Sequence, residues 1–179
     1  MKLFIFDIDG TLLLTGGAGR VAFEIIFEEL FQIKGAWKKI IPDGKTDPLI
    51  IEELAQKNLS RSLTKDEYQI VYDKYDIYFE QELPRSENFR VMPGVPELLS
   101  ELHQREDVLL GIATGNFEKA ARLKLKQGGM DHFFDFGGFG SDSSKREELT
   151  HAAVERGRAL GSEDVQEQDI YVVGDTIHD

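Results

Sequence analysis

Three short apolar segments, each followed at once by small polar or acidic residues, constrain the fold of this chain more than any other feature. They lie at residues 2–9, 108–113 and 170–173. Nearly continuous apolar runs of this length are typical of strands buried on both faces of a parallel sheet. Helical patterns accompany them at residues 95–105, 117–126 and 145–160. The alternation of strand and helix predicts an α/β fold with a doubly wound, Rossmann-like parallel sheet.

The residues at the ends of these segments are chemically alike. The first segment ends in Asp7-Ile8-Asp9-Gly10-Thr11, the second in Thr114-Gly115-Asn116, and the third in Gly174-Asp175-Thr176-Ile177-His178-Asp179. In an open α/β sheet the ligand binds beyond the carboxyl ends of the strands. We therefore expect the three polar ends to converge on one crevice.

The stretch between residues 16 and 90 does not fit this alternation, because it predicts several helices in a row and no clear strand. Apolar residues at positions 23, 26, 27 and 30 have helical spacing. Asp47-Pro48 indicates an N-cap followed by a proline in the first turn, and Thr64-Lys65-Asp66-Glu67 matches a capping box. We interpret residues 16–90 as a helical cap inserted after the first strand, and residues 1–15 and 91–179 as the α/β core.

Charge and composition exclude several classes of protein. The formal net charge of −12 disfavours binding to nucleic acid or to an anionic membrane surface, and no basic run offsets it. The absence of cysteine excludes disulfides, zinc–thiolate sites and thiol catalysis. The apolar run at residues 3–6 is too short for a signal peptide or a membrane span, so we expect a cytoplasmic protein. The sequence does not indicate an oligomeric state.

The acidic residues at the strand ends suggest a site for a hard cation. Asp7 and Asp9 are two positions apart on an extended strand, so their carboxylates face the same side. Adjacent carboxylates require a shared proton or a divalent cation, unless the pair only ends a strand and caps a turn. Asp175 and Asp179 supply further oxygen ligands suited to Mg²⁺. We expect His178 to be a surface residue.

The second strand end offers groups that could hold phosphate oxygens. The hydroxyl of Thr114 and the backbone amides of Gly115 and Asn116 are suited to that task. Asn116 is also a natural N-cap for a helix that begins at Phe117, so both interpretations stay open.

The three motifs, in this order, resemble those of the haloacid dehalogenase superfamily, and within it the phosphoglycolate phosphatase-like hydrolases with a helical cap. The resemblance implies that Asp7 is the nucleophile and Asp9 the general acid and base. It also implies Mg²⁺ bound by Asp7, the carbonyl of Asp9, Asp175, and Asp179 either directly or through water. The acid at Asp9 favours phosphoryl transfer over carbon–halogen cleavage, because a halide departs without protonation.

The remaining motif of the superfamily requires a cation beside the phosphate. Here residues 141–148 read Ser-Asp-Ser-Ser-Lys-Arg-Glu-Glu, and we expect Ser144 and Glu147 to form a capping box. Lys145 and Arg146 then fall in the first helical turn, where a bound anion would offset their charge. The pattern resembles a subfamily variant with arginine, so we prefer Arg146 and keep Lys145 as the alternative.

The sequence thus predicts a cap-gated phosphatase of small phosphorylated metabolites, with phosphoglycolate as the leading substrate by resemblance. Lys45, Thr46 and Asp47 resemble a cap loop that contacts substrate, although they could equally form a turn before a capped helix. A phosphomutase of the same superfamily is one alternative, and a receiver-like phosphorylated switch, which is not an enzyme, is another. Because related chains continue through a further strand and one or two helices, the resemblance also implies that the core is truncated after Asp179.

Overall fold

The computed structural model describes residues 1–38, 40–42, 44–161 and 165–176. Within these ranges β1 (Lys2–Phe6), β4 (Val108–Thr114), β5 (Phe136–Phe139) and β6 (Ile170–Val173) form one sheet in the order β5-β4-β1-β6. All three pairings are parallel, with Phe4 opposite both Leu110 and Tyr171. The predicted α/β fold with a parallel sheet is therefore confirmed.

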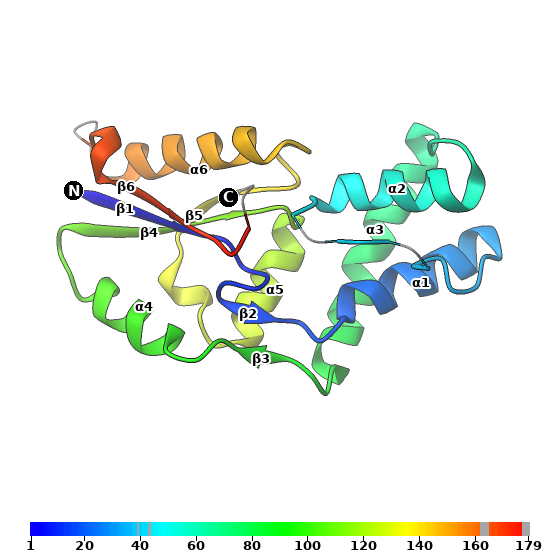
Figure 1. Cartoon of the computed structure of the whole chain (residues 1–179), viewed down its shortest axis with the longest axis horizontal. Coiled ribbons are helices and arrows are strands. Elements are labelled where there is room, and N and C mark those ends of the chain that lie inside the picture. The colour runs from blue at the N-terminus through cyan, green and yellow to red at the C-terminus, as the bar shows by residue number, and fades with distance from the viewer. Residues whose placement is uncertain (39, 43, 162–164, 177–179) are drawn as a thin grey trace.

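Helices cover both faces of the sheet (Figure 1). The helices α4 (Val95–His103) and α5 (Glu118–Gln127) lie on one face, and α6 (Arg146–Gly161) lies on the other. Side chains alternate along β1, so Phe6 packs with the α4 and α5 layer while Ile5 packs against α6. Burial on both faces explains why β1 and β4 are apolar at nearly every position.

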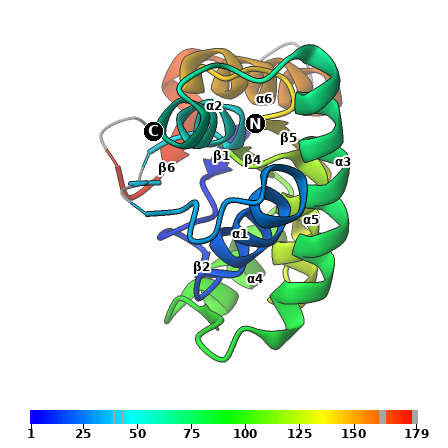
Figure 2. The ribbon, with the colours of Figure 1, turned by 90° about the vertical axis from the view of Figure 1, so that its right-hand side faces the viewer.

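Three further helices form a separate layer at the carboxyl ends of the strands (Figure 2). These are α1 (Ala18–Phe31), α2 (Asp47–Leu59) and α3 (Lys65–Glu82), and a short 3₁₀ helix, Leu83–Arg85, follows α3. An aromatic cluster that includes Phe23, Tyr75 and Phe79 fills their interior. The capping box predicted at Thr64 and Glu67 is confirmed at the start of α3. None of the described helices is long and apolar enough to cross a membrane.

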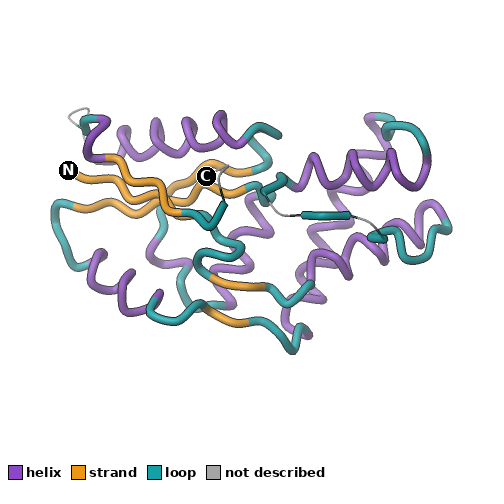
Figure 3. The backbone as a smooth tube through the Cα atoms, in the orientation of Figure 1, coloured by secondary structure: helices purple, strands orange, loops and turns teal. Residues whose placement is uncertain are grey.

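The chain enters and leaves the helical layer through a small antiparallel pair of strands, drawn in orange in Figure 3. The pair consists of β2 (Leu13–Leu14) and β3 (Arg90–Val91), with Leu13 opposite Val91. The sequence did not predict these strands, because two residues are too few to produce a periodic pattern. Their pairing brings the two connections between core and cap side by side.

The sheet also contains a strand that the sequence analysis missed. Residues 136–139 of β5 read Phe-Gly-Gly-Phe, and glycine disfavours a strand prediction. The structure explains this composition, since a Cβ added to Gly138 would collide with the Leu149 carbonyl oxygen of α6. The glycine therefore permits close contact between the sheet and α6.

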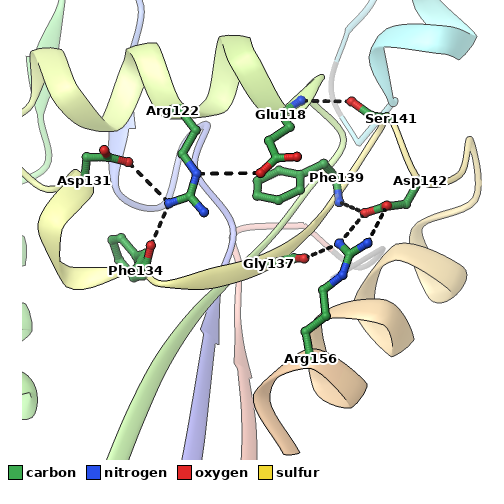
Figure 4. Close-up of polar contacts among 9 residues, drawn as sticks. All are labelled: Glu118, Arg122, Asp131, Phe134, Gly137, Phe139, Ser141, Asp142 and Arg156. Atoms are coloured by element: carbon green, nitrogen blue, oxygen red, sulfur yellow. Dashed lines mark hydrogen bonds and ion pairs between the residues drawn. The ribbon is translucent and has the colours of Figure 1, made fainter. Parts of the chain in front are cut away.

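Two arginines fix β5 and the loop that follows it (Figure 4). Arg122 of α5 donates a 2.6 Å hydrogen bond to the carbonyl of Phe134, just before the strand. Arg156 of α6 donates to the carbonyl of Gly137 at 2.6 Å and forms a bidentate ion pair with Asp142, with both distances 2.7 Å. The ion pair of Arg156 with Asp142 holds the segment between β5 and α6, which leads to Arg146.

Candidate active site

A pocket of about 380 Å³ lies between the carboxyl ends of the strands and the helical layer. It brings together residues from all three predicted strand ends, from the start of α6 and from the cap. Its lining includes Asp7, Asp9, Thr114, Gly115, Asn116, Arg146, Asp175, Lys45 and Asp47. Asp179 and His178 lie outside the described residues. Within the described residues, the polar strand ends therefore converge on one pocket, as the sequence predicted.

Asp7 and Asp9 follow β1 but have different surroundings. Asp7 is buried, its backbone N–H donates to the carbonyl of Val173 at 2.9 Å, and Nη2 of Arg146 lies 3.4 Å from its Oδ1. Asp9 is more open, with 41% of its side chain exposed, and its Oδ2 accepts a 2.6 Å hydrogen bond from Nζ of Lys124. The first carboxylate is therefore held deep beside an arginine, and the second faces the open part of the pocket.

Gly10 allows the first and third strand ends to approach each other. It has a φ of +87°, and a Cβ built on it would overlap Oδ2 of Asp175. A side chain at this position would be strained by its backbone conformation and would displace the Asp175 carboxylate. The glycine of the first motif thus places an acid of the last motif directly against the loop after β1.

The loop after β4 is organised differently from the N-cap interpretation. Asn116 does not cap α5, which begins at Glu118, because Oδ1 of Asn116 accepts hydrogen bonds from Thr114 at 3.1 Å and from Lys124 at 2.8 Å. The backbone N–H of Glu118 instead donates to the hydroxyl of Ser141 at 3.0 Å (Figure 4). The side-chain oxygen of Asn116 therefore bonds to two other residues of the pocket.

The two candidate cations at the start of α6 point in different directions. The side chain of Arg146 is 11% exposed and reaches Asp7, whereas that of Lys145 is 74% exposed and pairs with Glu148 at 2.8 Å. The expected capping box of Ser144 and Glu147 is wrong. The hydroxyl of Ser143 accepts from the backbone of Lys145 at 3.1 Å, and the helix begins at Arg146. This geometry favours Arg146, although its role in binding phosphate stays a prediction.

The cap loop meets the core through Thr46 and Asp47. The hydroxyl of Thr46 donates to the carbonyl of Ser144 at 3.1 Å, and the backbone N–H of Asp47 donates to the carbonyl of Gly115 at 2.7 Å. A Cβ on Gly115 would lie 2.7 Å from the carbonyl oxygen of Lys45, so the glycine permits this approach. Nζ of Lys45 itself pairs with Glu53 at 2.5 Å.

The sequence analysis expected Asp47 to be the N-cap of its own helix, and this prediction is wrong. Thr46 occupies that position, and Oδ2 of Asp47 instead accepts a 2.8 Å hydrogen bond from the backbone of Phe117 in the core. Asp47 is 3% exposed, and burial raises its pKa to about 6. The nearby Lys124 ammonium and the bond from Phe117 lower that pKa, so they offset only part of the effect of burial.

Lys124 is a buried charged residue of the pocket that the sequence analysis missed. It lies on α5, is 4% exposed, and bonds to both Asp9 and Asn116. A signal was present, because Ala121, Lys124 and Leu125 share one face of the helix and the other two are apolar. A lysine on a buried helix face requires a partner of opposite charge or polarity.

The residues available for a metal are oxygen donors. Asp7, Asp175 and the loop that carries the Asp9 carbonyl line the same pocket, and such hard ligands suit Mg²⁺. Among the described residues, no group of three or more His, Cys, Asp or Glu side chains could hold a metal ion by itself. These oxygen donors are of the kind that the sequence analysis predicted, and the Asp9 carboxylate contacts Lys124, while the Mg²⁺ site itself stays a prediction.

Fold and pocket together define an α/β enzyme in which acidic and cationic side chains meet between a parallel sheet and a helical cap. The model of the haloacid dehalogenase-like hydrolase family matches residues 1–179. The chain belongs to this hydrolase family, as its motifs predicted.

Several solved structures have the same fold. A predicted phosphoglycolate phosphatase from Haemophilus somnus 129PT has a TM-score of 0.68 and 21% identity over 98% of this chain and 77% of its own. CbbY from Rhodobacter sphaeroides, in complex with phosphate, has a TM-score of 0.73 and 16% identity, covering 99% and 79%. The magnesium-bound YfnB from Bacillus subtilis has a TM-score of 0.58 and 17% identity, covering 99% and 81%. A search of curated proteins found no match.

Proposed function

We propose that this hydrolase is a Mg²⁺-dependent phosphatase of small phosphorylated metabolites that forms an aspartyl-phosphate on Asp7. The observation that carries the proposal is the largely buried pair of Asp7 and Arg146, whose Oδ1 and Nη2 lie 3.4 Å apart in the lining of the pocket. A carboxylate nucleophile needs a cation close by, because the phosphate that it attacks is itself an anion. The pocket above this pair is open to a ligand and is lined by Asp9.

The chemistry divides into two steps that use the same residues. In the first, a carboxylate oxygen of Asp7 bonds to phosphorus, the bond from phosphorus to the leaving oxygen breaks, and that oxygen takes its electron pair and the proton of the Asp9 carboxyl. In the second, the Asp9 carboxylate removes a proton from water, whose oxygen bonds to phosphorus while the bond to Asp7 breaks. The products are the alcohol and inorganic phosphate, and both carboxyl groups return to their starting state.

Haloacid dehalogenase-like hydrolases generally use Mg²⁺. In this chain we assign its binding to Asp7, the carbonyl of Asp9 and Asp175, together with Asp179, which lies outside the described residues. The ion would offset the negative charge of phosphate and of Asp7. Arg146 supplies a second positive charge from a different element, α6.

The cap side of the pocket supports the proposal of a small substrate. Its wall combines apolar side chains, among them Phe23, Trp37 and Ile50, with the cations Arg20 and Lys45. Because Arg20 and Lys45 pair with Glu24 and Glu53, the wall suits a compact leaving group with a polar end, which is compatible with phosphoglycolate. Hydrolysis without any requirement for a sugar bisphosphate would separate this function from that of a phosphomutase.

The test is a screen of phosphorylated metabolites with Mg²⁺, followed by Asp7→Asn. This variant should lose phosphate release and labelling by beryllium fluoride, because an amide is not a nucleophile for phosphorus. The matched control is Asp135→Asn, which changes an exposed aspartate away from the pocket and should keep full activity. Full turnover by Asp7→Asn would reject the mechanism.

A further inference from the structure

We propose that Lys124 is a positioning residue that holds the Asp9 carboxyl in the orientation needed to protonate the leaving group. The inference rests on the proposed function, because it concerns the proton transfer assigned to Asp9. It goes beyond that function by giving a task to a residue on α5, outside the three strand-end motifs and the start of α6. Lys124 lies 115 positions from Asp9 along the chain and contacts it at 2.6 Å.

The geometry gives Lys124 a defined place between three elements. The side chain extends from α5, and its Nζ lies 5.7 Å from the centre of the Phe79 ring of α3. The same ammonium group bonds to Asp9 after β1 and to Asn116 after β4. Lys124 is 4% exposed, so its charge is almost completely removed from water. Such burial is unfavourable in isolation and is offset only by well-placed partners.

The Asp9 carboxylate depends on Lys124 for its orientation. Within the part of the chain that the structure describes, Lys124 is the one side chain that bonds to the Asp9 carboxylate. Without such a bond, an aspartate at a strand end can occupy any of several staggered side-chain rotamers. The bond from Lys124 selects one of them, while the remaining 41% exposure of the Asp9 side chain leaves it accessible from the pocket.

A purely structural role would not require a lysine. An apolar side chain of similar length, such as methionine, would fill the same space beside Phe79, but it would leave the oxygens of Asp9 and Asn116 without the donor that Lys124 supplies. The cation therefore contributes something that packing does not. Its two oxygen partners are both pocket residues, which points to control of the site.

The inference has a consequence that separates it from a general loss of structure. An aliphatic alkoxide is strongly basic and departs only if Asp9 protonates it, whereas p-nitrophenolate is weakly basic and departs without help. Removing the residue that positions Asp9 should therefore slow the first class of substrate far more than the second. The ratio of the two rates does not depend on what fraction of a preparation is folded.

The experiment compares Lys124→Met with the wild type on an alkyl phosphate and on p-nitrophenyl phosphate, with kcat/KM as the readout, since it reports the steps up to release of the leaving group. We expect kcat/KM for the alkyl phosphate to fall roughly 10–100-fold, a part of the about 10²–10⁴-fold that general acid catalysis contributes, and that for p-nitrophenyl phosphate to fall less than about 3-fold. Lys126→Met, an exposed lysine two positions along α5, is the matched control and should leave both values unchanged.

A second variant pair checks that the effect passes through Asp9. In an Asp9→Asn background, Lys124→Met should cause little further loss with the alkyl phosphate, because the group that it positions can no longer donate the proton. Where Lys124→Met does not fold, Lys124→Gln retains a hydrogen-bond donor, and the same ratio is measured, with a smaller expected fall.

The outcomes are distinct. An equal fall for both substrates, or additive losses in the double variant, would overturn the positioning role. An increase in KM for the alkyl phosphate with kcat unchanged would also overturn it, since Lys124 would then bind substrate directly. A wild type that hydrolyses neither substrate would reject the proposed phosphatase function itself, and the inference with it.

Discussion

Replacing Asp47 by asparagine tests how the contact between cap and core depends on protonation. Asp47 is 3% exposed, and its Oδ2 accepts a 2.8 Å hydrogen bond from Phe117. Burial raises its pKa from an ordinary 3.8 to about 6, against the opposing influence of Lys124 and of the bond from Phe117. The folded protein therefore holds this proton more tightly than the unfolded chain does.

The sign and size of the effect follow from that difference. As the pH rises from 3.8 to about 6, the unfolded chain has already released the proton while the folded protein still binds it, so the free energy of unfolding falls. A shift of about 2 units is worth about 3 kcal/mol, at about 1.4 kcal/mol per unit. The amide that replaces the Asp47 carboxyl cannot ionise and still presents an oxygen to Phe117. We expect the stability of Asp47→Asn relative to wild type to rise by up to about 3 kcal/mol between about pH 4 and about pH 7.

Urea unfolding followed by circular dichroism at several pH values measures this difference directly. Glu67→Gln provides a contrast of opposite sign, because the bonds of Glu67 to Arg61 and to the backbone of Thr64 lower its pKa to about 2. The stabilisation that the Glu67 carboxylate contributes is present above pH 4.5 and is lost as the pH falls through about 2. The stability of Glu67→Gln should therefore approach that of the wild type in acid. A difference for Asp47→Asn that stays constant with pH, or that falls as pH rises, would refute the reasoning.

Two further predictions concern the phosphate and the metal. Arg146→Ala should raise KM and lower kcat, with a total loss of about 10²–10³ in rate, because a charge-assisted contact to both bound phosphate and the transition state is removed. Lys145→Ala should be nearly silent in the same steady-state assay, since that side chain faces Glu148 on the surface, and the reverse result would transfer the role to Lys145. Turnover should require Mg²⁺ and be inhibited by Ca²⁺, whose looser geometry lets the Asp7 carboxylate bind through both oxygens. Undiminished phosphate release in the presence of a chelator would contradict the proposed metal site.

The sequence by itself determined the α/β class and the main residues of the pocket. Strands buried on both faces must be apolar throughout, so β1 and β4 were visible as runs. The run of β6 was visible too, because it is equally apolar, although Tyr171 and Val172 are exposed. The polar groups at their carboxyl ends were recognisable because the direction of a parallel strand decides where its end lies. The capping box at Thr64 was equally clear, since both of its hydrogen bonds join residues three apart.

Tertiary structure alone decided the features that depend on contacts between distant segments. The strand β5 was missed because Gly137 and Gly138 reflect close approaches to neighbouring segments, such as that of α6 to Gly138, and not strand propensity. The carboxylate of Asp47 was expected at the start of its own helix but binds Phe117, 70 positions away. Lys124 reaches Asp9 across 115 positions. No local pattern encodes such partners, because burial of a charged group is stabilised by whichever opposite group the fold brings within hydrogen-bond distance.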